Sequence, residues 1–174
     1  MRKTILYVAM SLDGYIADQN GGVSWLMGDG SDPESLGTYP AFYDSIDTIL
    51  LGYTTYHQII TVLSPDKWVY EGKRCYVLTS KAVASHDDIV FTSEEIVALV
   101  ETLKAEKGKD IWVCGGAALA QNMITKDLID EYRISIVPVL LGGGMSLFGT
   151  TRKELKLCTS SQCNGITELR YLNR

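Results

Sequence analysis

The chain has 174 residues, the usual size of one domain, and 46% of them are hydrophobic and 21% charged, as in folded globular proteins. Its 16 basic and 21 acidic residues leave a net charge of −5, which argues against nonspecific nucleic-acid binding. No apolar run approaches the roughly 18 residues that cross a bilayer, and the N-terminus lacks the features of a signal peptide. We therefore expect one cytoplasmic domain over residues 1–174 that binds neither nucleic acid nor a membrane.

The cysteines do not have the pattern of a metal site. Cys75 and Cys114 lie within apolar runs, where a buried free thiol is the usual state. Cys158 and Cys163 are five residues apart in a polar stretch, and neither histidine lies at zinc-like spacing from them. The Gly-x-Ser-x-Gly motif of serine hydrolases is also absent. We expect no metal and no serine nucleophile.

Short apolar runs alternate with helical patterns along the first two thirds of the chain. Strands are predicted at residues 4–9, 48–51, 75–78 and 111–114, because these runs are nearly continuously apolar, as in strands buried on both faces. Helices are predicted near residues 39–46, 54–62, 92–107 and 117–124. The third is the clearest, since Thr92 and Glu95 have the spacing of a capping box and apolar residues follow at helical intervals.

The last third of the chain has a different pattern. Residues 132–137 alternate apolar with polar, residues 167–172 form a further strand candidate, and no long helix fits between 142 and 174. Strands that alternate with helices predict a parallel sheet covered on both faces, and the tail predicts antiparallel strands. The expected fold is a three-layer α/β domain whose mostly parallel central sheet has antiparallel C-terminal edge strands.

Ligands of open parallel sheets bind beyond the carboxyl ends of the strands, where four unusual segments occur in this chain. They are residues 11–17, 52–56, 79–81 and 115–119. Gly115 and Gly116 precede a predicted helix, so backbone N–H groups and the helix dipole converge there and suit a phosphate. An ordinary tight turn explains two glycines equally well, the hydroxyl-rich segments can be plain helix caps, and the G-x-G-x-x-G fingerprint is absent. Four such segments together favour a nucleotide site.

In their order along the chain, the motifs resemble the riboflavin-biosynthesis reductase (RibD C-terminal) domain, which has a dihydrofolate reductase-like fold. The motifs lie at residues 11–17, 25–26, 47–52, 55–56, 77–80, 113–116, 128–131, 138–144 and 147–148. Each is weak alone, but the ordered set is specific and spans nearly the whole chain.

The resemblance implies an NADPH-dependent reductase that transfers a hydride to a small heterocycle, a pyrimidine or pteridine-like compound, as 5-amino-6-(5-phosphoribosylamino)uracil reductases do. It implies the pyrophosphate at a cis Gly115–Gly116 peptide, NADH as a weaker ligand, and a homodimer, for which the outer face of strand 132–137 is the candidate surface. The implied cofactor-binding residues are Ala9, Gly52, Thr54, Thr55, Thr79, Ser80, Lys81, Gly115, Gly116, Ala117, Ala118 and Leu119.

Asp13, after the first strand, is the candidate catalytic residue, as an acid or as an orienting group, although an aspartate before Gly14 is equally typical of a turn. Candidates for the substrate pocket are Trp25, Phe42, Tyr56 and Pro138. For the three aromatic residues, ordinary core packing is an equal alternative.

Two departures from the family pattern bear on function. Tyr53 stands where the family often has an arginine that holds the 2′-phosphate of NADPH, which leaves Lys81 as a point charge. The carboxylates after the tryptophan, Asp29, Asp32 and Glu34, lie in a polar loop, so dihydrofolate is a weaker alternative substrate. A nucleotide-binding module of the same fold without turnover is the other alternative.

Overall fold

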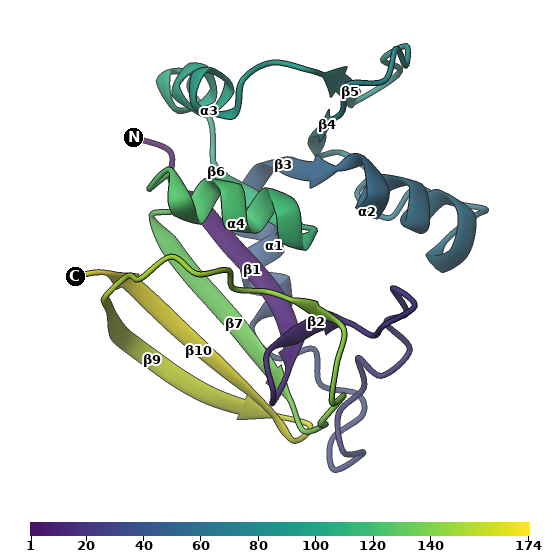
Figure 1. Cartoon of the computed structure of the whole chain (residues 1–174), viewed down its shortest axis with the longest axis vertical. Helices are drawn as coiled ribbons and strands as arrows, with labels where there is room; N and C mark the ends of the chain where they lie inside the picture. Colours follow the sequence, from purple (N-terminus) through teal and green to yellow (C-terminus); the bar gives the residue numbers. More distant parts are fainter.

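An eight-stranded sheet runs through the computed structural model, which describes all 174 residues. In spatial order its strands are β5 (Ile89–Thr92), β4 (Arg74–Leu78), β3 (Ile46–Gly52), β6 (Asp110–Gly115), β1 (Thr4–Ser11), β7 (Glu131–Val137), β10 (Ile166–Asn173) and β9 (Leu155–Cys163). The strands from β5 to β7 pair in parallel, and β10 and β9 add antiparallel pairs (Figure 1). The predicted sheet, mostly parallel with an antiparallel C-terminal edge, is confirmed.

Helices cover both faces of the sheet, because successive strand residues point to opposite sides. Leu6 and Val8 of β1 face α3 (Ile96–Ala105) and α4 (Ala117–Thr125). Ile5 and Tyr7 of β1 face α1 (Tyr39–Ser45), α2 (Tyr53–Gln58) and the π-helical turn η1 (Ile59–Leu63). A small ribbon of β2 (Tyr15–Ala17) and β8 (Met145–Ser146) lies outside the main sheet. The three predicted layers are therefore present.

The predicted start of the third helix is wrong. Thr92 is the last residue of β5, which pairs with β4, and α3 begins only at Ile96. The N-cap is Glu95, whose carboxylate accepts a hydrogen bond from the backbone N–H of Val97 at 2.7 Å. Thr92 and Glu95 have the capping-box spacing, but Thr92 pairs with β4 as part of a strand and therefore does not cap the helix. The other predicted helices differ from the observed ones by a few residues at most.

The predicted apolar outer face of strand 132–137 is also absent. This segment is β7, which lies between β1 and β10 in the interior of the sheet. Its apolar residues Tyr132 and Ile134 belong to the core beneath α4, and the polar Arg133 and Ser135 alternate with them. The alternation therefore reflects one buried apolar face and one polar face, and it supplies no surface for a partner. No helix in the structure is long and apolar enough to cross a membrane.

Candidate functional site

The carboxyl ends of β3, β4, β6 and β1 share one edge of the sheet, because these strands are parallel. Two glycines from different strand ends approach each other there. A Cβ placed on Gly52 would lie 3.6 Å from the backbone N of Gly116, and one placed on Gly116 would lie 3.1 Å from Oγ1 of Thr55. The Gly115–Gly116 peptide is cis, as predicted. The structure thus brings together Gly52, Thr55, Gly115 and Gly116.

Helix α4 begins directly after this glycine pair. Gly116 is its N-cap and no side chain completes the cap. The first N–H groups of a helix, here those of Ala117, Ala118 and Leu119, have no partner within the helix. Together with the positive end of the helix dipole, these donors suit an anionic group such as a phosphate. The segment predicted to bind a phosphate therefore lies at a helix N-terminus that no side chain caps.

A polar cavity of about 280 Å³ lies at the carboxyl ends of β4 and β5. Its lining is Thr79, Ser80, Lys81, Ala82, Val83, Phe91, Thr92 and Ser93. The ammonium of Lys81 lies over the ring of Tyr53, with Nζ 4.1 Å from the ring centroid, a distance at which the ring attracts the cation. Lys81 takes part in no ion pair. This cavity, called the lysine pocket below, offers hydroxyls and one uncompensated positive charge.

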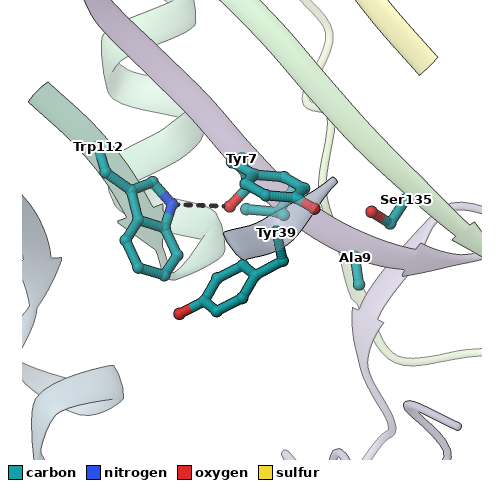
Figure 2. Close-up of a pocket in the computed structure, with 6 residues that line it drawn as sticks. Tyr7, Ala9, Tyr39, Trp112 and Ser135 are labelled. Atoms are coloured by element: carbon teal, nitrogen blue, oxygen red, sulfur yellow. Dashed lines mark hydrogen bonds between the residues drawn. The ribbon is translucent and has the colours of Figure 1, made fainter. Parts of the chain in front are cut away.

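A second cavity, of about 210 Å³, is largely aromatic and is called the aromatic pocket below (Figure 2). Its lining is Tyr7, Val8, Ala9, Tyr39, Trp112 and Ser135. The indole N–H of Trp112 donates to the backbone carbonyl of Tyr7 at 2.9 Å, which holds one wall in place. Burial raises the pKa of Tyr39 to about 12, so its hydroxyl is neutral at physiological pH. Aromatic walls with a few polar groups are typical of a site for a planar ring.

Asp13 is exposed and accepts three hydrogen bonds. Ser11 Oγ donates to it at 2.6 Å, and the backbone N–H groups of Leu141 and Gly142 donate at 3.1 and 2.7 Å. The hydrogen bond from Ser11 is the largest cause that lowers the pKa of Asp13, and the two backbone donors add to it. An ionised carboxylate has no proton to give at neutral pH. The geometry therefore favours the orienting alternative, in which Asp13 holds the loop after β7.

Two predicted substrate residues lie in the core. Phe42 is fully buried beneath Tyr7, with ring centroids 4.5 Å apart and rings perpendicular. Tyr56 is 7% exposed and packs edge-on against Phe91. Neither lines the lysine pocket or the aromatic pocket, because the sheet and its aromatic neighbours cover both rings. Their burial favours the core-packing alternative over a place in the substrate pocket.

The remaining candidates lie outside both pockets. Trp25 is half-buried and its indole N–H donates to the backbone carbonyl of Gly22 at 3.1 Å, and Pro138 is exposed after β7. Asp29, Asp32 and Glu34 are exposed in the loop between β2 and α1. The backbone N–H groups of Asp29 and Asp32 donate hydrogen bonds to the turn between β9 and β10. None of the three carboxylates lines the aromatic pocket.

Six residues at the aromatic pocket were not predicted from the sequence: Tyr7, Val8, Tyr39, Trp112 and Ser135, which line it, and Glu168, which accepts a hydrogen bond from Tyr7. Tyr7 and Trp112 belong to apolar runs that look like plain core. A serine at a position buried within a strand was a usable signal, because a buried hydroxyl needs a partner or a ligand.

Comparisons with known proteins agree with this architecture. The sequence model of the RibD C-terminal domain matches residues 2–169. The uncharacterized proteins YwjB and YyaP of Bacillus subtilis (strain 168) are 39% and 34% identical to the chain, which covers 98% and 94% of their lengths, and 98% of the chain matches each. A structure from Shewanella sp. PV-4, named for riboflavin biosynthesis, superposes with a TM-score of 0.86 at 29% identity over 99% of both chains. Acinetobacter baumannii RibD superposes at 0.70 and 18% identity, over the whole of this chain and 58% of its own, and shows the same fold.

Proposed function

Because the chain belongs to the RibD C-terminal domain family, we propose that it is an NADPH-dependent reductase that transfers a hydride to a pyrimidine or pteridine-like substrate. The observation that supports this proposal is that a glycine pair, an uncapped helix N-terminus and the lysine pocket all lie at the carboxyl ends of the parallel strands. The aromatic pocket formed by β1, β6 and β7 supplies a place for a planar ring. The family makes a reaction of the 5-amino-6-(5-phosphoribosylamino)uracil reductase type the leading candidate.

The residues present fit the cofactor. Gly52 and Gly116 leave space that a Cβ would fill, so a phosphate can approach the backbone there. The N–H groups that begin α4, at Ala117, Ala118 and Leu119, would bind the pyrophosphate. The lysine pocket, with Thr79, Ser80 and Lys81, would bind the adenosine end and its 2′-phosphate, and Ala9 would lie by the nicotinamide.

When bound, the dihydronicotinamide supplies the hydride, and the protein's contribution is binding, orientation and exclusion of water. The walls of the aromatic pocket, Tyr39 and Trp112 among them, would hold the substrate ring. Asp13 would hold the 138–144 loop through its hydrogen bonds to Leu141 and Gly142. Thr54 and Thr55, at the start of α2, would contact the cofactor from the side of β3.

The expected homodimer remains part of the proposal, with a different surface. β9 is the outer strand of the sheet and pairs only with β10, so one row of its backbone groups is unpaired. Seven of its nine residues are exposed, and among them is the apolar Leu157, which is 51% exposed. An exposed strand edge is a template for pairing with a second strand. β9 of a second copy is the partner that we propose.

Consumption of NADPH tests the function. Purified protein is mixed with NADPH and either 5-amino-6-(5-phosphoribosylamino)uracil or dihydrofolate, and the loss of the nicotinamide absorbance is followed. We expect turnover with the ribosylaminouracil and little with dihydrofolate, because no carboxylate after Trp25 lines the aromatic pocket. NADPH binding without turnover of any heterocycle would instead favour the non-catalytic nucleotide-binding module.

A further inference from the structure

The polar end of the aromatic pocket is a row of side chains on three neighbouring strands. Ala9 of β1 pairs with Ser135 of β7, and Ser135 pairs with Glu168 of β10. Tyr7 precedes Ala9 by two residues and therefore faces the same side of β1. Its hydroxyl donates to Oε1 of Glu168 at 3.0 Å and points toward the hydroxyl of Ser135 (Figure 2). A carboxylate from β10 thus stands directly behind the pocket wall.

The direction of the Tyr7 proton follows from the partners of Glu168. An ionised carboxylate only accepts hydrogen bonds, so Tyr7 is the donor of the pair. Glu168 also accepts from the backbone N–H of Thr38 at 3.1 Å, which fixes its position. Burial is the largest cause that raises the pKa of Tyr7 and the charge of Glu168 adds to it, whereas hydrogen bonds from the side chains of Thr38 and Ser135 lower it, so the hydroxyl keeps its proton. Because that proton is directed at Glu168, the Tyr7 oxygen at the wall of the aromatic pocket can act toward the pocket only as an acceptor.

The charge of Glu168 is not neutralised by a basic partner. No ion pair of the structure includes it. The arginines on the same faces of β7 and β10, Arg133 and Arg170, both bind Glu131 instead. An unneutralised carboxylate polarises the hydroxyl that it holds, which strengthens that oxygen as an acceptor. The lysine pocket, in contrast, carries an uncompensated positive charge.

We propose that Tyr7 and Glu168 form an acceptor site that selects substrates whose heterocycle presents amino or ring N–H groups to the β7 side of the aromatic pocket. Tyr7 contacts the ring, and Glu168 is the positioning residue that directs the Tyr7 proton away from it. This assignment rests on the proposed reductase function, since the ring in question is that of its substrate. A ring with a carbonyl or methyl group at this edge would leave the buried acceptor without a donor, which lowers affinity.

Two probes of similar size separate donor recognition from simple packing: diaminopyrimidine, and dimethylpyrimidine with methyl groups in place of the amino groups. Each is titrated calorimetrically into the full chain without NADPH, at a pH where both rings are uncharged. We expect the diamino probe to bind about ten- to a hundredfold more tightly, the range of a hydrogen bond to a charged group. Tyr7→Phe removes the acceptor, and Glu168→Gln removes the charge and lets an amide donate to Tyr7. Each should abolish the preference while the dimethyl probe binds as before.

Ser161→Ala is the matched control, because it removes a hydrogen bond to Glu168 outside the pocket and keeps the charge. Its preference should equal that of the wild type, whereas a merely structural role of Glu168 would weaken both probes alike. Equal affinities in the wild type, no binding of either probe, or a preference retained in both pocket variants would overturn the inference. NADPH binding, followed by nicotinamide fluorescence in the same proteins, is the independent readout of the proposed function. NADPH binding without a probe preference would refute the acceptor site alone, and the reverse result would refute the reductase alone.

Discussion

Lys81 and Tyr53 lie together where we propose that the 2′-phosphate of NADPH binds. The ammonium rests over the Tyr53 ring at 4.1 Å from the centroid, at the border of the lysine pocket. An arginine at position 53 would offer a planar fork of donors, whereas lysine offers a point charge. The tyrosine has no charge of its own, but its ring keeps the lysine at the pocket.

Replacing Lys81 by alanine tests whether it recognises the 2′-phosphate. Lys81→Ala should weaken NADPH binding about ten- to a hundredfold, because a hydrogen bond to a charged group contributes about 1.5–3 kcal/mol. NADH binding should be nearly unchanged, since NADH lacks that phosphate. Fluorescence titration with both cofactors measures the effect, and Lys67→Ala, an exposed lysine outside the pocket, is the control. Equal losses for the two cofactors would show that Lys81 does not recognise the 2′-phosphate.

At the scale of elements, a buried carboxylate joins the last strands of the sheet. The side chain of Glu131, at the start of β7, is 1% exposed. Arg170 of β10 donates two hydrogen bonds to it at 2.8 and 2.9 Å, and Arg133 donates a third at 2.7 Å. Burial raises the pKa of Glu131, but the bonds from Arg170 and then Arg133 outweigh it and lower the pKa below the ordinary 4.5.

Glu131→Gln should lower the free energy of unfolding by about 3 kcal/mol at neutral pH, because it leaves two arginines without their charge partner. A lowered folded-state pKa means that the stabilisation is present above pH 4.5 and is lost as the pH falls through the folded value. The difference between wild type and variant in urea unfolding should therefore shrink on acidification.

Glu154→Gln is the control for this experiment. Glu154 is exposed and pairs only at longer range with Arg152 and Arg174, at 3.6 and 3.7 Å. Its replacement should change stability by less than about 1 kcal/mol. A loss in Glu131→Gln that stays constant from neutral to acid pH would contradict the assignment of the charge network.

The elements that the sequence predicts well are those whose surroundings are uniform. Cys75–Leu78 and Ile111–Cys114 are apolar throughout because both of their faces are buried. β9 gives no such signal, since most of its residues are exposed and its sequence is mixed. For the site, Gly115 and Gly116 are predictable because the strand, turn and helix that need them are adjacent in the chain. Glu168 is not, because only the register between β7 and β10 brings it behind Tyr7.

At the scale of the whole molecule, β9 is the outer strand of the sheet beyond β10. The proposed dimer would extend this sheet into a second copy, so its interface lies on the far side of β10 from the aromatic pocket. Glu168 also accepts a hydrogen bond from Ser161 of β9, which links the proposed interface to the acceptor site.

Light scattering at micromolar concentration should give twice the 19.2 kDa mass of one chain. Leu157→Lys should yield monomers, because a charge replaces the exposed apolar side chain on β9. Val62→Lys, at an apolar position 69% exposed in η1, should remain dimeric. A wild-type protein of 19.2 kDa would refute the dimer. A dimer insensitive to Leu157→Lys would place the interface elsewhere.

The central position of β1 has a consequence for the chain during its synthesis. Thr4 pairs with Ile111 and Ile5 with Glu131, so this strand leaves the ribosome well before the two strands with which it pairs. At about 5–20 residues per second, the apolar residues 5–8 wait on the order of ten seconds before a partner strand exists. During that interval a nascent chain exposes the segment that later forms the centre of the sheet. Chaperone contact with these residues, or aggregation in their absence, is therefore a cost inherent in this strand order.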